Sequence, residues 1–214
     1  MNNEEIQNLR KNYKKNIFHE ENAQANPISQ FEAWFKEALS TLCDEPNAFT
    51  LSTVKAGRPR SRVVLLKGIT PDGFIFFTNY ESDKGQEIKD NPLCAMNFLW
   101  LPLERQVRIE GQIEVVNKEI SDDYFSKRPR GSQIGAIASP QSQILTSRED
   151  LENHFKNLEL KYAPESIISR PDNWGGYLIK PNYFEFWQGR ESRLHDRICY
   201  QLKDNNWVKL RLAP

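Results

Sequence analysis

The hydrophobic pattern of the chain changes from a helical period to a period of two after Pro46, and this change constrains the fold most. Residues 55–59 and 71–73 hold the Gly and Pro residues that are typical of tight turns. The alternating runs lie at 48–54, 61–67 and 74–78. Three strands at hairpin spacing predict an antiparallel meander that can close into a barrel.

Helices are expected on both sides of this β region. A weak, mostly polar helix is predicted at 2–15, and a firm apolar stripe predicts a second helix from Ser29, as its N-cap, to Leu42. Further helices are predicted at 82–90, 121–128 (capped by Ser121) and 148–162, a loop at 131–142, and further strands at 93–99, 106–116, 175–179, 183–188, 197–202 and 207–210. The predicted fold class is mixed β with flanking α-helices. We expect a mobile N-terminal segment at 1–25 and a single domain at 26–214.

The charge balance and the cysteines limit the classes of protein. Lys and Arg together number 29, as do Asp and Glu, so the formal net charge is zero, which argues against a nucleic-acid or membrane-surface binder. The three cysteines are far apart and odd in number, which favours a reducing cytoplasm over a disulfide framework. The first 25 residues are polar and contain no apolar h-region, so no signal peptide is expected. No apolar run reaches about 18 residues, so no membrane span is expected.

The common catalytic motifs are absent from the sequence. There is no GxGxxG after a strand, no GxxxxGK[ST], no HExxH and no GxSxG. The three histidines are too dispersed to predict a metal site. These absences disfavour a Rossmann dinucleotide enzyme, a P-loop enzyme, a zincin and an α/β-hydrolase, so any anion has to be held by side chains on strands and loops.

The stretch from Phe184 to Arg197 has the pattern of a ligand site. It holds three arginines, one histidine, three acids and a tryptophan, interleaved with apolar residues. Planar guanidinium groups suit phosphate and carboxylate oxygens, and a histidine can titrate near neutral pH. If Arg193, His195 and Arg197 begin a strand, they share one face, and so dense a cationic patch indicates an anionic partner. We interpret the stretch as the wall of a site for an anionic, ring-shaped ligand.

Three weaker clusters of polar residues precede it. Arg62 and Lys67 lie at the ends of one predicted strand and point to opposite faces, which solvated strand ends would equally explain. Thr78, Asn79, Ser82 and Lys84 span a strand end and a helix start, where amides and a lysine can bind phosphate. Tyr124 and Arg128 are four residues apart, with Ser132 beyond them. As an isolated pair they would be surface packing.

The longer motifs resemble those of the pyridoxine/pyridoxamine 5′-phosphate oxidase family over nearly the whole chain. The strongest is Phe184-Glu185-Phe186-Trp187-Gln188 followed, after four residues, by Arg193-Leu194-His195-Asp196-Arg197. The other motifs that match, in the same order, are residues 62–67, 77–79, 103–107, 124–130, 132–136 and 211–214.

This resemblance implies an FMN-binding split β-barrel that works as a homodimer with two FMN sites at the subunit interface. It also implies an enzyme that oxidises pyridoxamine or pyridoxine 5′-phosphate to pyridoxal 5′-phosphate, with O2 as the acceptor and H2O2 as the product. No metal, nucleic acid or membrane is expected to take part.

The resemblance also implies the site residues. Those expected to bind FMN are Arg62, Val63, Val64, Leu65, Lys67, Phe77, Thr78, Lys84, Gln106, Gln141, Ser142, Trp187 and Arg197. Those expected to bind substrate are Arg10, Tyr13, Lys67, Tyr124, Arg128, Ser132, Arg193, Leu194 and His195, with Arg10 and Tyr13 as an N-terminal lid. Arg193 and His195 are the candidate catalytic residues, and Arg193 is expected to affect turnover most.

One departure from the family pattern concerns the cofactor. The family usually has Ser-Arg-Lys where this chain has Ser82-Asp83-Lys84, so an acid replaces a phosphate-binding arginine. By Coulomb's law this weakens phosphate binding unless Asp83 turns outward. Two alternatives therefore remain open: a non-catalytic flavin or pyridoxal-phosphate carrier, and a flavin reductase, against which the complete match at residues 193–197 argues.

Overall fold

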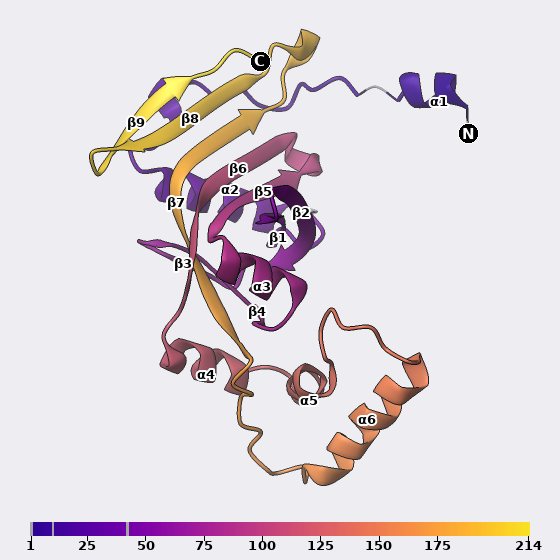
Figure 1. Cartoon of the computed structure of the whole chain (residues 1–214). Helices are drawn as coiled ribbons and strands as arrows, with labels where there is room; N and C mark the ends of the chain where they lie inside the picture. Colours follow the sequence, from indigo (N-terminus) through magenta and orange to yellow (C-terminus); the bar gives the residue numbers. More distant parts are fainter. Residues whose placement is uncertain (1, 10, 42) are drawn as a thin grey trace. The chain divides into compact units, whose positions relative to one another are not determined.

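The computed structural model describes residues 2–9, 11–41 and 43–214 (Figure 1). Its helices are α1 (Asn3–Gln7), α2 (Pro27–Ser40), α3 (Asp83–Asp90), α4 (Lys118–Ser126), α5 (Arg130–Ala138) and α6 (Arg148–Lys161), with short 3-10 turns at η1 (Glu20–Asn22), η2 (Leu101–Leu103) and η3 (Glu191–Arg193). Its strands are β1 (Ala48–Lys55), β2 (Arg58–Leu65), β3 (Gly68–Thr70), β4 (Gly73–Asn79), β5 (Leu93–Trp100), β6 (Arg105–Val115), β7 (Trp174–Gln188), β8 (Asp196–Lys203) and β9 (Asn206–Arg211). The expected fold class, mixed β with flanking helices, is confirmed.

The strands follow the order β2-β1-β5-β6-β7-β4-β3, with β8 also paired to β7 and β9 to β8. Strand β4 pairs antiparallel with β7, in the register Phe76 to Tyr177. The expected meander of β1, β2 and β4 is therefore wrong, because the third strand has a hydrogen-bonded neighbour from much later in the chain. The path of hydrogen-bonded strands starts at β2 and ends at β3, so the described sheet is not closed.

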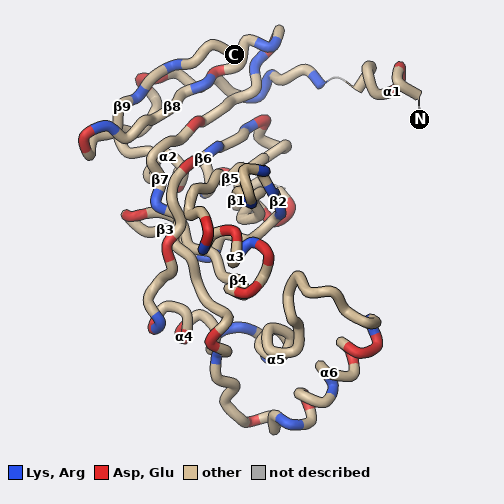
Figure 2. The backbone as a smooth tube through the Cα atoms, in the orientation of Figure 1, with Lys and Arg blue, Asp and Glu red and all other residues tan. Residues whose placement is uncertain are grey.

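The chain divides into two compact units, each made of separate stretches of sequence. Unit 1 comprises residues 1–50, 95–110 and 181–214, and unit 2 comprises residues 51–94 and 111–180. Basic residues (Lys and Arg) and acidic residues (Asp and Glu) are interspersed along the backbone (Figure 2). No helix in the described part of the chain is long and apolar enough to cross a membrane.

Helix α2 buries its apolar face in the core of unit 1. The Phe31 ring packs against Phe98 at 4.9 Å, and the Trp34 ring against Phe186 at 5.3 Å between centroids. The helix begins earlier than expected, because Asn26 rather than Ser29 is the N-cap: its side chain accepts the amide hydrogens of Ile28 and Ser29.

A small apolar cluster forms the core of the helical part of unit 2. It consists of the buried residues Phe125, Ile134, Ile168 and Trp174. Residues 131–142 were expected to be a loop, but most of them form α5, which lies beside α6 (Figure 1). The expectation was wrong because the burial of Ile134 and the hydrogen bond from the Gln133 amide to the Phe125 carbonyl outweigh the low helix propensity of Ser and Gly.

Two further expectations about this region are corrected. Asn117, and not Ser121, caps α4, since the Asn117 side chain accepts the Ile120 amide hydrogen. The buried Ser121 hydroxyl instead accepts the Gly176 amide hydrogen at 3.1 Å. The two strands expected at 175–179 and 183–188 are one strand, β7, which continues through Pro181.

Candidate functional site

The residues expected to bind ligands fall into one cluster in unit 2 and another in unit 1, and each cluster is described by itself. The unit 2 cluster is built on three parallel aromatic rings. Phe77, from β4, stacks on Tyr124 of α4 at 3.9 Å and on Trp174 at 5.7 Å, with interplanar angles of 11° and 10°. Burial raises the pKa of the Tyr124 hydroxyl above its usual value.

Arg128 lies on this aromatic stack. Its guanidinium carbon is 4.5 Å from the centre of the Trp174 ring, a cation–π distance. Its Nη1 atom is buried and has no hydrogen-bond partner among the described residues. Burial lowers the pKa of the guanidinium. A buried, unpaired donor of this kind is costly, and an anionic ligand would satisfy it.

A cavity of about 280 Å³ opens beside this guanidinium. It is lined by Asn79, Arg128, Ser132, Gly135, Ala136, Ser139, Gln141 and Trp174. The structure therefore brings together Arg128 and Ser132, which were expected to bind substrate, with Gln141, which was expected to bind FMN. The interpretation of Arg128 as mere surface packing does not account for its buried nitrogen.

Lys84 is a second buried cation in unit 2. Its ammonium group donates to the hydroxyls of Thr78 at 3.1 Å and Ser82 at 3.2 Å, and among the described residues it has no salt-bridge partner. Burial, and next the charge of Arg62, lower its pKa. The Thr78 hydroxyl in turn donates to Gln141 at 3.2 Å. Lysine, hydroxyls and amide together form a group of donors suited to an anion.

Arg62 is already paired to an acid. Its Nη2 lies 2.6 Å from the buried Glu87 carboxylate, and its Nη1 donates to the Thr53 hydroxyl at 2.5 Å. Burial alone raises the pKa of Glu87, but the hydrogen bonds from Thr53 and Arg62 outweigh it, so the pKa is lowered. Asp83, the departure from the family pattern, is exposed at the start of α3.

The other expected residues of unit 2 are nearer to solvent. Val63 and Lys67 are exposed, Val64 and Leu65 are half-buried, and Ser142 is exposed with a left-handed backbone (φ 73°). Lys67 lies beyond the end of β2, so the expectation that it ends one strand with Arg62 is wrong.

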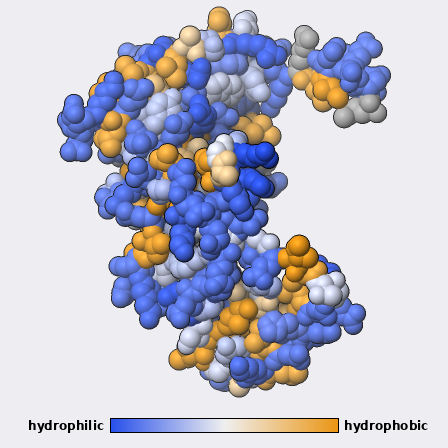
Figure 3. All heavy atoms as spheres, in the orientation of Figure 1, coloured by the Kyte–Doolittle hydropathy of each residue, from blue (hydrophilic) through white to orange (hydrophobic). Residues whose placement is uncertain are grey.

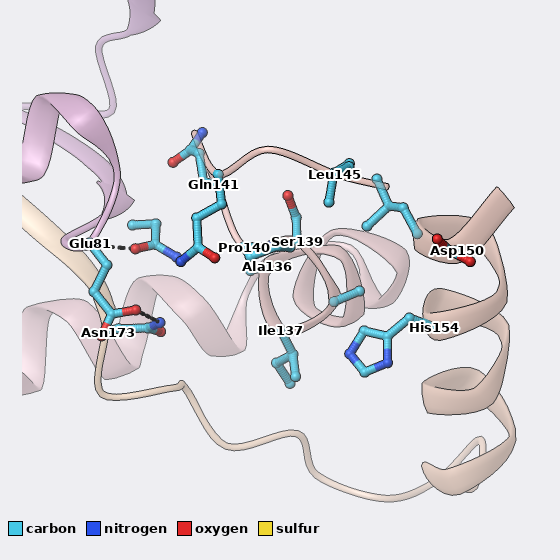
Figure 4. Close-up of a pocket in the computed structure, with 14 residues that line it drawn as sticks. Glu81, Ala136, Ile137, Ser139, Pro140, Gln141, Leu145, Asp150, His154 and Asn173 are labelled. Carbon is cyan, nitrogen blue, oxygen red and sulfur yellow. Dashed lines mark hydrogen bonds between the residues drawn. The ribbon is translucent and has the colours of Figure 1, made fainter. Parts of the chain in front are cut away.

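A larger cavity, of about 360 Å³, is lined by residues of α5, α6 and the segment between them (Figure 4). Gln141 and Ser139 line both cavities. Figure 4 shows Glu81 and Asn173, joined by a hydrogen bond of 2.8 Å, on one side of the larger cavity, and His154 and Asp150 from α6 on the other. Sequence reasoning pointed to Asn79 and Gln141 here, but not to Glu81, Asp150, His154 or Asn173.

The unit 1 cluster is centred on His195. Its ring lies 4.6 Å from Trp187 and 5.8 Å from Tyr13, between centroids. Its Nδ1 atom accepts the amide hydrogen of Arg190 at 3.1 Å. Burial, and next the positive charge of Arg193, lower the pKa of the imidazole.

The residues around His195 do not begin a strand, as had been expected. Residues 191–193 form η3, in which Ser192 and Arg193 have left-handed φ values of 54° and 62°, and β8 starts only at Asp196. The alternation that would place Arg193, His195 and Arg197 on one face is therefore broken. Arg193 and Leu194 are both exposed.

The acids of this stretch pair with its arginines. Asp196 binds Arg190 at 2.8 Å and Arg211 at 2.9 Å, and Arg197 binds the buried Glu185 at 2.9 Å. These pairs neutralise part of the cationic patch. Gln106 is half-buried on β6. Arg10, expected in the lid, lies outside the described residues.

Three residues that shape the two clusters were missed by sequence reasoning. Trp174 supports Arg128, Glu87 binds Arg62, and Glu104 accepts two amide hydrogens from the segment that follows Tyr13. Of these three residues, only Trp174 has a recognisable signal in the sequence: it directly precedes two glycines at the start of β7.

The sequence matches two family profiles. Residues 35–162 match the profile described as "Pyridoxamine 5'-phosphate oxidase", and residues 174–214 match "Pyridoxine 5'-phosphate oxidase C-terminal dimerisation region". Curated proteins named pyridoxine/pyridoxamine 5'-phosphate oxidase are similar over the full length. That of Actinobacillus pleuropneumoniae serotype 5b is 49% identical over 210 residues, covering 98% of this chain and 100% of that protein. That of Salinibacter ruber is 49% identical over 212 residues, covering 98% and 99%.

Solved structures agree on the fold. PhzG from Burkholderia lata 383, in complex with tetrahydrophenazine-1-carboxylic acid, has a TM-score of 0.87 and 29% identity, covering 93% of this chain and 98% of that one. A pyridoxamine 5'-phosphate oxidase-related, FMN-binding protein from Nostoc punctiforme has a TM-score of 0.73 at 17% identity, covering 89% and 100%. These similarities confirm the expected split β-barrel. On the match of both profiles and of full-length relatives, the chain belongs to the pyridoxine/pyridoxamine 5′-phosphate oxidase family of enzymes.

Proposed function

We propose that this protein is an FMN-dependent oxidase that converts pyridoxamine or pyridoxine 5′-phosphate to pyridoxal 5′-phosphate, with O2 as the acceptor and H2O2 as the product. The single observation that supports a phosphorylated substrate most directly is the buried Nη1 of Arg128, which pairs with no described residue, beside a cavity of about 280 Å³. We assign the substrate phosphate to Arg128, Ser132 and Tyr124, with Lys67 near it.

The residues present also fit a phosphate-bearing cofactor. The buried ammonium of Lys84 donates to two hydroxyls and, among the described residues, forms no salt bridge, as expected of a group that binds an anionic ligand. Asp83 is exposed, which removes the main objection to phosphate binding. FMN, when bound, supplies a two-electron acceptor that no side chain provides. We assign it to Arg62, Lys84, Thr78, Gln141 and Ser142. The resemblance to the family adds Gln106, Trp187 and Arg197 as further candidate contacts of FMN.

His195 and Arg193 are proposed to orient the substrate ring. Because the Nδ1 of His195 accepts the Arg190 amide hydrogen, a neutral imidazole carries its proton on Nε2, which is then a donor to the substrate. Arg193 supplies a positive charge nearby. We expect Arg193→Leu to lower turnover on pyridoxamine 5′-phosphate most among single changes in this stretch, and unchanged turnover would refute the role of Arg193.

We also propose that the protein works as a homodimer in the cytoplasm. The match of residues 174–214 to a dimerisation-region profile supports the dimer, and the unpaired cysteines suit a reducing compartment. Sedimentation equilibrium should give about 50 kDa, twice the chain mass of 25.0 kDa. A mass of one chain would contradict the dimer.

Anaerobic titration of the purified yellow protein tests the activity. Pyridoxamine 5′-phosphate should bleach the visible flavin band, and admission of air should restore it with formation of peroxide. A yellow protein that binds the compound without bleaching would instead be a flavin or pyridoxal-phosphate carrier.

The likeness to PhzG supports a second candidate, oxidation of a reduced tricyclic carboxylic acid. The same titration with tetrahydrophenazine-1-carboxylic acid discriminates the two. The phosphorylated substrate should bleach the flavin at the lower concentration, because Arg128 and Ser132 suit a phosphate group.

A further inference from the structure

Glu104 occupies an unusual position at the turn between η2 and β6. It is 4% exposed, and its backbone is left-handed, with φ 56° and ψ 41°. A non-glycine residue in this conformation is strained, and it persists only where its surroundings hold it. Its position in unit 1 is therefore enforced by specific contacts.

The carboxylate of Glu104 is bound by main-chain donors. Its Oε2 accepts the amide hydrogens of Lys14 at 2.9 Å and Lys15 at 3.1 Å. Among the described residues, the exposed ammonium of Lys11 lies 4.0 Å from the other carboxylate oxygen. In that part of the chain the two consecutive peptide groups are the close donors to the buried carboxylate, and charge-assisted hydrogen bonds of this kind are the strong ones.

The backbone of Glu104 is joined to the end of β7. Its carbonyl oxygen accepts the Gly189 amide hydrogen at 2.8 Å and a hydrogen from the Gln188 side chain at 3.2 Å. One residue therefore links the segment at 13–15 to the strand that contains Trp187.

Tyr13 immediately precedes the two bound amides. Its ring makes edge contacts with Trp187 at 5.6 Å and with His195 at 5.8 Å. A Cβ atom at Gly189 would lie 2.8 Å from the Tyr13 ring, so the ring packs directly on the glycine backbone. Its place over His195 thus depends on where residues 14 and 15 are held.

We propose that Glu104 is a positioning residue whose carboxylate holds the segment after Tyr13 so that the Tyr13 ring stays against His195 and Trp187. If the segment moved away, the buried carboxylate of Glu104 would lose its two hydrogen-bond donors. Glu104 consequently favours the covered state of this cluster. The expected effect on substrate affinity rests on the proposed function. The hydrogen bonds between Glu104 and the segment do not depend on it.

Hydrogen exchange of the FMN-bound protein tests the bond without reference to activity. In Glu104→Gln an amide oxygen replaces the charged acceptor, so the amides of Lys14 and Lys15 should exchange about tenfold faster. Exchange that is unchanged at both amides would overturn the proposal. Exchange that rises equally throughout unit 1 would also overturn it, since the effect would then be a general loss of stability.

Kinetics test the consequence for substrate. Glu104→Gln should raise the KM for pyridoxamine 5′-phosphate about tenfold, with kcat changed less than about twofold, since the bond affects covering of the cluster and not the chemistry. In a Tyr13→Ala background the same change should have little further effect on KM. Fully additive effects would overturn the link to Tyr13.

A matched pair at position 14 separates the main chain from the side chain. Lys14→Pro removes the amide donor, so it should reproduce the rise in KM. Lys14→Ala keeps the amide and loses only an exposed ion pair with Glu191, so KM should stay at the wild-type value. Equal effects of the two changes would overturn the proposal. If neither the wild type nor any variant oxidises pyridoxamine 5′-phosphate, the proposed function fails. The hydrogen-exchange result for Lys14 and Lys15 would still stand.

Discussion

Arg128 has a buried nitrogen with no hydrogen-bond partner among the described residues, which is costly in a folded protein unless a ligand binds it, and its guanidinium lies over the Trp174 ring. Arg128→Met keeps apolar contact with Trp174 and removes the charge. We expect the KM for pyridoxamine 5′-phosphate to rise about 100-fold, since a charge-assisted hydrogen bond contributes about 1.5–3 kcal/mol.

Thermal unfolding provides the second measurement on that variant. The ligand-free Arg128→Met protein should be at least as stable as the wild type, because a desolvated charge has been removed. Arg148→Met, at an exposed arginine of α6, is the control and should leave KM unchanged. A KM unchanged in Arg128→Met would contradict the assignment of the substrate phosphate.

His195 should make stability depend on pH in a defined direction. Its pKa in the folded protein lies below the usual 6.5, because of burial and Arg193. As pH falls through 6.5 the unfolded chain takes up the proton first, so the folded state loses stability below that pH and gains nothing above it. The wild type should therefore lose more thermal stability between pH 7.5 and 5.5 than His195→Asn, which retains an acceptor for the Arg190 amide. An equal loss in both proteins would exclude His195 as the source.

For single residues, the sequence was largely sufficient to name the members of the candidate site, but it did not predict which residues they contact. Arg128 and Ser132 could be named and do share a cavity. That Arg62 is engaged by Glu87, or that Asp196 binds Arg211, depends on contacts between residues distant in sequence. Local patterns contain no signal for such contacts.

At the scale of elements, we expect replacement of glycine by alanine to have opposite effects on stability at two helical positions, Gly85 and Gly131. A Cβ at Gly85, in the first turn of α3, would lie 2.1 Å from the Tyr80 carbonyl oxygen, so Gly85→Ala must move the backbone. We expect it to lower the free energy of unfolding by about 1–3 kcal/mol or more. Gly131, in α5, has nothing within 4 Å of its Cβ position, so Gly131→Ala should raise stability by up to about 1 kcal/mol.

Urea unfolding of both variants checks this pair. A Gly85→Ala protein as stable as the wild type would mean that α3 can shift away from Tyr80 freely. A destabilised Gly131→Ala protein would mean that α5 requires the conformational freedom of glycine.

The elements themselves show why prediction succeeded or failed. Periodicity located α2, α3, α6 and most strands, since their apolar residues face one core. It failed at α5, whose helix depends on burial of Ile134, and at caps such as Asn117, where a neighbouring polar residue was an equally good candidate. It also failed at residues 191–193, where left-handed backbone replaces the expected strand.

At the scale of the molecule, anion binding should be visible as stabilisation. The formal net charge is zero, so a general response to anions should be small. FMN at about 100 times its dissociation constant should stabilise the fold by about 2.7 kcal/mol, or about 5–11 °C in Tm. Inorganic phosphate should give a smaller rise than FMN, but a larger one than chloride of equal ionic strength.

Two lysines of α3 provide the control for this effect. Lys84→Met should lose most of the rise in Tm, because the buried ammonium of Lys84 forms no salt bridge within the described part of the chain and is free to bind the anion. Lys89→Met, at an exposed site on the same helix, should keep it. Equal rises in the two variants would place the anion elsewhere.

Exposed apolar side chains are also visible at this scale. Those of unit 2 include Ile144, Leu160 and Ile167, and Figure 3 shows apolar atoms among hydrophilic ones around α5 and α6. The sequence identified these residues as apolar but could not tell which of them the fold would leave uncovered.

The pairing of β4 with β7 has a consequence for the synthesis of the protein. Strand β4 is buried and apolar, and its partner begins only at Trp174, so on the ribosome β4 waits for its neighbour for about 5–20 s at ordinary elongation rates. Neither unit is continuous in sequence, so neither can complete its core until late in translation. The yield of active protein should therefore depend more on chaperone supply and growth temperature than the stability of the finished fold would suggest.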